Sequence, residues 1–85
     1  MNIIEMLDAV KNGKKVKREC WKNSFIYYVP QCSYIAMTKI AKTIMDSNGK
    51  VPYEEYIAQK FENGKVGFYN PSQSDLFAND WMIDD

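Results

Sequence analysis

Two adjacent residues, Asn63 and Gly64, separate two segments that have the composition of β-strands. Residues 56–61 (YIAQKF) and 65–69 (KVGFY) contain the β-branched and aromatic side chains that favour strands. Asn-Gly is the pair best suited to a tight hairpin turn, because both turn positions need a positive φ. The sequence therefore predicts an antiparallel hairpin, and the remaining segments must fit around it.

The first third of the chain predicts one helix and two more strands. Residues 3–12 place apolar side chains at helical spacing, and Asn2 and Glu5 have the spacing of a capping box. Residues 24–29 (SFIYYV) are typical of a strand. Residues 15–18 (KVKR) alternate weakly, and we expect an edge strand whose lysines discourage further pairing.

The rest of the chain predicts short helices and a last strand. Residues 34–48 begin ambiguously, and from Thr38 onward they fit a helix that ends near Gly49. Residues 72–75 (SQSD) have capping-box spacing before one helical turn, and residues 81–83 predict a strand. The predicted fold is α+β: a small antiparallel sheet with an amino-terminal helix and one or two further short helices, packed on one face.

Twelve of the 85 residues are aromatic. A domain of this length buries only about 60% of the surface of its unfolded chain, so some of these rings should be exposed. A subunit interface and a ligand pocket are the usual reasons for exposed aromatic side chains. We therefore expect residues 1–85 to form one domain that is homo-oligomeric and binds a ligand.

The chain contains no histidine, which excludes Ser-His-Asp and Cys-His catalysis within it. Its two cysteines are too few for an all-thiolate zinc site. We predict no catalytic residues, no metal and no cofactor, and therefore a binding protein rather than an enzyme. Cys20 and Cys32 are expected to be reduced thiols, one or both of them packed in the interior.

The charge of the chain sums to zero but is unevenly distributed. Residues 1–42 carry eight basic and three acidic groups, whereas residues 43–85 carry three basic and eight acidic groups. The basic stretch can hold phosphates or face the acidic half of the chain or of a neighbour. Nucleic-acid binding is not expected, because the chain as a whole is not basic. No membrane-spanning run or secretory signal is visible, so we expect a cytoplasmic protein.

Several residues have both a structural and a functional interpretation. Trp21 is either a core residue or a platform on which a base or ribose stacks. Ser72, Ser74 and Asp75 either cap a helical turn or bind a phosphate or hydroxyl group. Asp75 and Asp80 are better interpreted as a cap and a solvated surface charge than as an acid–base pair. Residue chemistry alone points to a small, aromatic-rich binding module.

Two motifs resemble a known family. Residues 13–21 (GKKVKRECW) fit the pattern G-K-x-V-x-R-x-x-W, and residues 75–81 (DLFANDW) fit D-L-x-A-x-D-W. Together with the amino-terminal helix and residues 27–28 (YY), they resemble the second Thoeris anti-defence family of small phage proteins. The resemblance runs from end to end, residues 31–52 contribute little to it, and the carboxy-terminal motif is the more specific.

The resemblance implies that the protein sequesters a signal. Members of this family bind glycocyclic ADP-ribose, the cyclic nucleotide made by a bacterial TIR-domain sensor, so that it cannot activate the Thoeris effector. The ligand is released intact, and some members also hold cyclic dinucleotides in separate sites. The resemblance further implies a homo-oligomer, typically a tetramer, with pockets between protomers, acting in the host cytoplasm during infection.

The side chains present suit such a ligand. Aromatic faces can stack the adenine, Arg18 and nearby lysines can meet the pyrophosphate, and hydroxyl and carboxylate groups can bond the riboses. Two alternatives are a phosphodiesterase that degrades the signal and an inhibitor that binds a host sensor protein directly. The predicted ligand-binding residues are Arg18, Trp21, Phe25, Tyr69, Asn70, Ser72, Ser74 and Asp75, and Trp81 is either a further contact or part of the scaffold.

Overall fold

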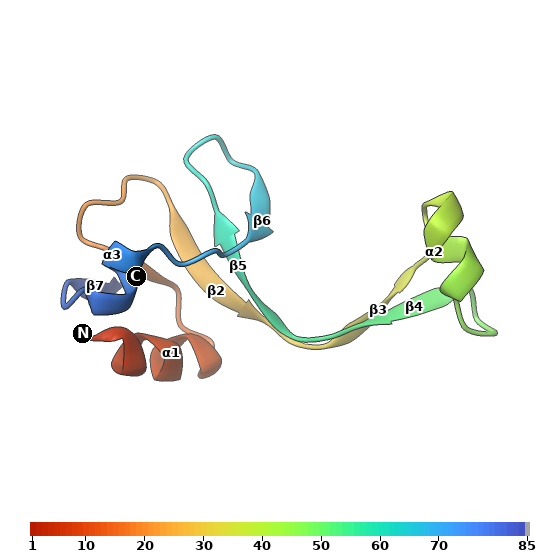
Figure 1. Cartoon of the computed structure of the whole chain (residues 1–85), viewed down its shortest axis with the longest axis horizontal. Helices are drawn as coiled ribbons and strands as arrows, with labels where there is room; N and C mark the ends of the chain where they lie inside the picture. Colours follow the sequence, from red (N-terminus) through yellow and green to blue (C-terminus); the bar gives the residue numbers. More distant parts are fainter. Residues whose placement is uncertain (85) are drawn as a thin grey trace.

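The computed structural model describes residues 1–84, in which an antiparallel sheet forms a body and a two-stranded arm extends from it (Figure 1). The α+β fold predicted from the sequence is confirmed. The helices are α1 (Ile3–Lys11), α2 (Lys39–Ile44) and α3 (Gln73–Phe77), and the strands are β1 (Val16–Arg18), β2 (Phe25–Val29), β3 (Cys32–Ile35), β4 (Lys50–Tyr53), β5 (Tyr56–Lys60), β6 (Val66–Phe68) and β7 (Trp81–Ile83).

The predicted hairpin joins β5 and β6 at one side of the sheet. Lys60 lies opposite Val66, and the Phe61 N–H donates to the Lys65 carbonyl oxygen at 2.8 Å. Gly64 has a φ of +87°, a backbone conformation that residues with a side chain rarely adopt. The hairpin is therefore confirmed, but its loop has three residues, 62–64, and of the Asn-Gly pair only Gly64 has a positive φ.

The expectation that residues 15–18 form an edge strand is wrong. The strand order of the main sheet is β6-β5-β2-β1-β7, so β1 lies between two partners. Val16 lies opposite Ile26 of β2 and also opposite Ile83 of β7, and it is fully buried. The lysines did not prevent pairing, because β7 arrives from the other end of the chain and covers the open side of β1.

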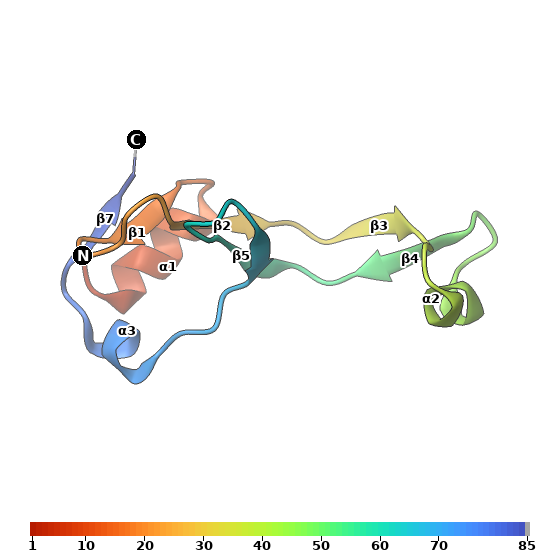
Figure 2. The same cartoon turned by 90° about the horizontal axis from the view of Figure 1, so that it is seen from above.

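The helices α1 and α3 contact each other beside the sheet, as Figure 2 shows. The capping box predicted for α1 is present, since Asn2 Oδ1 accepts from the Glu5 N–H at 2.9 Å. Within residues 1–84, no helix is long and apolar enough to cross a membrane. The core between helix and sheet consists of Met6, Val10, Val16, Ile26 and Trp81.

The arm continues the ribbon formed by β2 and β5. The register is unbroken, because Val29 faces Tyr56 in the body and Cys32 faces Tyr53 in the arm. At its far end the arm carries α2, which is distant from the body in both views (Figures 1 and 2). The prediction that the helices pack on one face of the sheet therefore holds for α1 and α3 and is wrong for α2.

The helix α2 begins where the sequence indicated and ends earlier. Thr38 caps it, with its hydroxyl oxygen accepting from the Ala41 N–H at 3.0 Å. It ends at Ile44 rather than near Gly49, because the Asp46 carboxylate accepts from two backbone N–H groups, those of Asn48 and Lys50. These bonds fold the chain into a turn that leads into β4.

Both cysteines are free thiols and both are exposed, so the prediction that one or both are packed is wrong. Cys20 lies in the turn that follows β1, outside the core. Cys32 lies on β3, where all four residues of the strand are exposed because no second layer covers the arm.

Candidate functional site

Asp75 is the centre of a polar network at the start of α3. The Ser72 hydroxyl oxygen accepts from the Asp75 N–H at 3.1 Å, and Asp75 Oδ2 accepts from the Ser72 N–H at 3.1 Å. This confirms the predicted capping box. The same Oδ2 accepts from the Tyr69 hydroxyl at 3.0 Å, and Oδ1 accepts from Arg18 Nη1 at 3.0 Å. The buried carboxylate thus links the helix cap to β1 and to the loop after β6.

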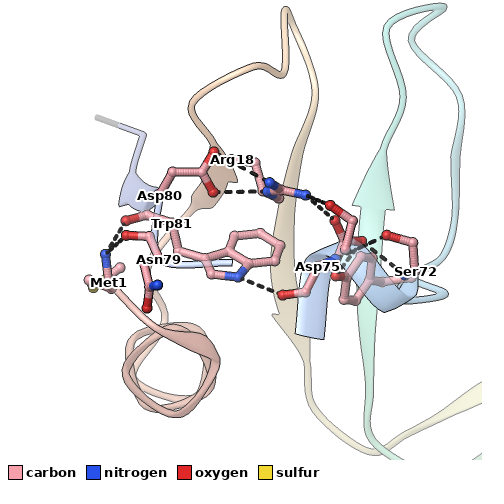
Figure 3. Close-up of polar contacts among 9 residues, drawn as sticks. Met1, Arg18, Ser72, Asp75, Asn79, Asp80 and Trp81 are labelled. Carbon is pink, nitrogen blue, oxygen red and sulfur yellow. Dashed lines mark hydrogen bonds and ion pairs between the residues drawn. The ribbon is translucent and has the colours of Figure 1, made fainter. Parts of the chain in front are cut away.

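The guanidinium of Arg18 lies between two aspartates (Figure 3). Its Nε donates to Asp80 Oδ1 at 2.9 Å, and its Nη1 donates to Asp75 and to the Ser74 hydroxyl, each at 3.0 Å. Asp80 is therefore not the solvated surface charge that the sequence suggested. Because most donors of Arg18 already have partners, its geometry favours positioning α3 over binding a phosphate. A direct ligand contact by Arg18 stays a prediction.

The network fixes the protonation states of its members. Burial alone raises the pKa of Asp75, but the bonds from Ser72, Arg18 and Tyr69 outweigh it and hold that pKa below its ordinary value. The bond from Arg18 likewise lowers the pKa of Asp80. Burial and the bond to Asp75 raise the pKa of Tyr69, and the bonds to Asp80 and Asp75 raise that of Arg18. Both aspartates are therefore ionised at neutral pH.

The two tryptophans have different environments. Trp81 is 2% exposed, and its indole N–H donates to the Asp75 carbonyl oxygen at 3.2 Å, which makes it part of the scaffold. Trp21 is only partly buried. Its ring packs edge-on against Trp81 and Tyr69, with centroid distances of 5.3 and 6.2 Å. Trp21 is consequently the tryptophan that retains exposed surface for a ligand.

The two family-like motifs lie side by side in the sheet. β1 pairs with β7, and Arg18 of the first motif lies opposite Trp81 of the second. The amino group of Met1 also joins this region, donating to the Asn79 and Trp81 carbonyl oxygens at 3.2 and 2.7 Å (Figure 3). Segments far apart in the sequence therefore build one local structure.

The structure connects six of the eight predicted site residues and separates two. We call the connected group the α3 cluster. Phe25 lies outside its contacts on β2, with Lys15 Nζ 4.7 Å and Lys60 Nζ 5.8 Å from its ring centroid. Asn70 is exposed in the loop between β6 and α3. The α3 cluster consists of Arg18, Trp21, Tyr69, Ser72, Ser74 and Asp75.

A second polar group was not found by sequence reasoning. Lys11 Nζ lies 2.8 Å from Glu55 Oε2, and the Tyr28 hydroxyl also donates to this carboxylate. The three side chains border an open groove of about 570 Å³ between α1 and the β2–β5 ribbon. No local signal predicts this pairing, because Lys11 and Glu55 are 44 residues apart.

The α3 cluster offers a partly exposed aromatic ring beside hydroxyl and carboxylate oxygens, which suits stacking and hydrogen bonding to a nucleoside. It is poorly suited to acid–base chemistry, because ionised aspartates with lowered pKa values are weak bases and carry no proton to donate. Among residues 1–84, no group of three or more Cys, Asp or Glu side chains is placed to hold a metal ion.

The fold and the site define a small α+β protein in which a buried polar network lies beside a partly exposed aromatic ring. The family model of the Thoeris anti-defense 2-like domain (Tad2-like) matches residues 1–83. The chain therefore belongs to this family, as its two motifs indicated, and this membership supports a role in phage anti-defence against Thoeris. A search of curated proteins found no match to the chain.

Proposed function

We propose that this protein binds and sequesters glycocyclic ADP-ribose without cleaving it, and thereby prevents activation of the Thoeris effector. Family membership supports the anti-defence role. The observation that carries the proposal is the partly exposed Trp21 ring beside the ionised Asp75 network. Such an arrangement binds flat rings and hydroxyl groups and lacks a proton donor of suitable pKa.

The net charge of the α3 cluster bears on which part of the ligand it would hold. Arg18 with Asp75 and Asp80 carries one net negative charge, which disfavours a pyrophosphate at that point. We propose that the base and a ribose occupy the α3 cluster and that lysines outside it hold the phosphates. Lys15 and Lys60 beside Phe25 are candidates, because both ammonium groups lie near an aromatic ring and neither is ion-paired within residues 1–84.

In a single chain, the α3 cluster supplies few side chains to surround a ligand of this size. We propose that protomers of a homo-oligomer, a tetramer by resemblance to the family, complete the pocket in the host cytoplasm. A preformed pocket between chains lowers the cost of ordering the site. Cyclic dinucleotides are a second candidate class of ligand by the same resemblance.

Calorimetry of the purified protein against cyclic ADP-ribose isomers and cyclic dinucleotides tests the proposal. We expect nanomolar affinity for glycocyclic ADP-ribose, about −12 kcal/mol. Ligand recovered after heat denaturation should be chemically intact by mass spectrometry. A cleaved product would indicate a phosphodiesterase. Absence of binding, combined with capture of a host sensor protein, would indicate a direct inhibitor.

Trp21→Ala should weaken binding of the ligand by about 100-fold, because stacking on one aromatic ring is worth up to about 3 kcal/mol per base and the ring also shapes the site. Trp21→Phe is the matched control, which retains an aromatic face and should bind within about tenfold of the wild type. Circular dichroism and solution mass must be unchanged in both variants. An Ala variant that binds normally would remove Trp21 from the site.

A further inference from the structure

The arm gives the chain an extended shape that its length does not require. The radius of gyration is 15.4 Å, whereas a compact chain of 85 residues has about 12 Å. No side chain of α2, which the structure describes in full, is buried. A helix of six residues is too short to be stable alone, so α2 needs a surface to pack against.

The arm exposes more apolar surface than a monomer normally does. Met37 is 82%, Ile40 78% and Ile44 65% exposed, and we call these three residues the α2 knob. Across residues 34–53, seven large apolar side chains are at least 45% exposed. Together they present on the order of 800 Å², about the area that one partner buries in a standard specific interface.

A concave apolar surface extends along the arm from α2 to the β5–β6 hairpin. Figure 1 shows α2 and the β5–β6 hairpin rising on the same side of the bent ribbon. Between them is a hollow of about 360 Å³, which Met37, Thr38 and Ala41 line on the α2 side, and we call its aromatic wall the saddle. Two edge-on pairs build this wall, with centroid distances of 5.5 and 4.6 Å: Tyr34 with Tyr53, and Tyr56 with Phe68.

We propose that the α2 knob of one chain packs into the saddle of a second copy, which returns the same contact. The knob is convex and apolar and the saddle concave and apolar, so one chain carries both halves of the contact. A reciprocal exchange closes with two-fold symmetry, the commonest arrangement of homo-oligomers. The charges agree, because Lys39 and Lys42 lie on α2, and the exposed Glu54 lines a neighbouring hollow that shares Tyr53, Tyr56 and Phe68 with the saddle.

Solution mass of knob and control variants tests this pairing. Ile40→Glu places a charge on the knob, and glutamate favours the helix at least as well as isoleucine, so the fold should be kept. The mass by light scattering, in multiples of 9.9 kDa, should fall by at least half relative to the wild type. The matched control is Ile4→Glu, at a 74% exposed position on α1, which should keep the wild-type mass.

Mixing two defective variants distinguishes packing of the knob into the saddle from packing of one arm directly against the other arm. Ile40→Glu and Phe68→Glu should each have a reduced mass when alone. An equimolar mixture should regain mass, because the intact knob of one variant still fits the intact saddle of the other. A wild-type mass for Phe68→Glu, no recovery on mixing, or a wild type that is monomeric at tens of micromolar would each overturn the proposal.

The proposal deepens the homo-oligomer of the proposed function, yet its test needs no nucleotide. A wild type that assembles through the knob and binds no cyclic nucleotide refutes the proposed function alone. Conversely, a wild type that captures the nucleotide while Ile40→Glu keeps its full mass refutes the packing alone.

Discussion

At the scale of single residues, Asp75 is the centre of the candidate site. Its carboxylate caps α3, accepts from Tyr69 and pairs with Arg18, so one side chain connects three segments. Ser72 shares only the capping bonds. Comparing substitutions of Asp75 and Ser72 therefore separates the stability contributed by the helix cap from the stability contributed by the ion pair with Arg18.

Asp75→Ala should lower the free energy of unfolding by about 3 kcal/mol, because it leaves the partly buried Arg18 charge with one partner fewer. Ser72→Ala is the matched control and should cost about 1 kcal/mol, the usual value of a lost cap. Urea denaturation measures both. Equal losses would show that the ion pair adds nothing beyond the cap.

Acid should destabilise the protein through the same aspartates. The folded pKa values of Asp75 and Asp80 lie below the ordinary value of 3.8, so in acid the unfolded chain binds more protons than the folded chain. The stability that these two ionised aspartates contribute is complete above about pH 5. It is lost as the pH falls below about 4 and passes through their folded pKa values. Thermal midpoints between pH 2 and 6 should fall toward acid, and less steeply in Asp80→Asn than in Asp8→Asn, a control outside the network.

At the scale of elements, the body and the arm have different supports. The main sheet is held by the core beneath α1, whereas β3 and β4 pair only with each other in the described chain. The core residues Met6, Val10, Val16, Ile26 and Trp81 all lie outside the arm. The body should therefore fold without the arm.

Replacing residues 30–55 by Asn-Gly tests this independence. Val29 and Tyr56 face each other in the register of β2 and β5, so a two-residue turn can join them. We expect a cooperative unfolding transition and an intact Trp21–Trp81 environment by near-ultraviolet circular dichroism. A shortened chain that is unfolded in buffer would show that the arm supports the body.

At the scale of the whole molecule, the chain is more extended than a compact domain of its length. Its extents are 45 × 26 × 25 Å, and seven of its exposed large apolar side chains lie on the arm. If subunits stabilise one another, mass action makes the thermal midpoint depend on protein concentration. Ligand binding adds to this stability in proportion to the logarithm of its concentration.

The thermal midpoint of the wild type should therefore rise when the protein concentration is raised from about 1 to 100 μM, and rise again with excess glycocyclic ADP-ribose. Scanning calorimetry measures both shifts. In Ile40→Glu the midpoint should depend less on protein concentration than in the wild type. A concentration-independent midpoint in the wild type would argue against stabilisation by assembly.

Local interactions were readable from the sequence. The β5–β6 turn at Gly64, the caps at Asn2, Thr38 and Ser72, and the strand after Ser24 are confirmed, because each is decided by residues within a few positions of one another. The two motifs contain three of the eight candidate site residues, Arg18, Trp21 and Asp75, and the structure connects six of the eight. Their contact with a ligand stays a prediction.

Long-range pairing was decided by the tertiary structure alone. β1 is an inner strand because β7 pairs with it, and Asp80 is a partner of Arg18 from 62 residues away. The arm arises because β2 and β5 continue their register past Val29 and Tyr56, beyond the reach of the core. The physical reason is common to all three: short-range patterns fix local conformation, whereas the partner of a strand edge or a charge is chosen only when distant segments meet.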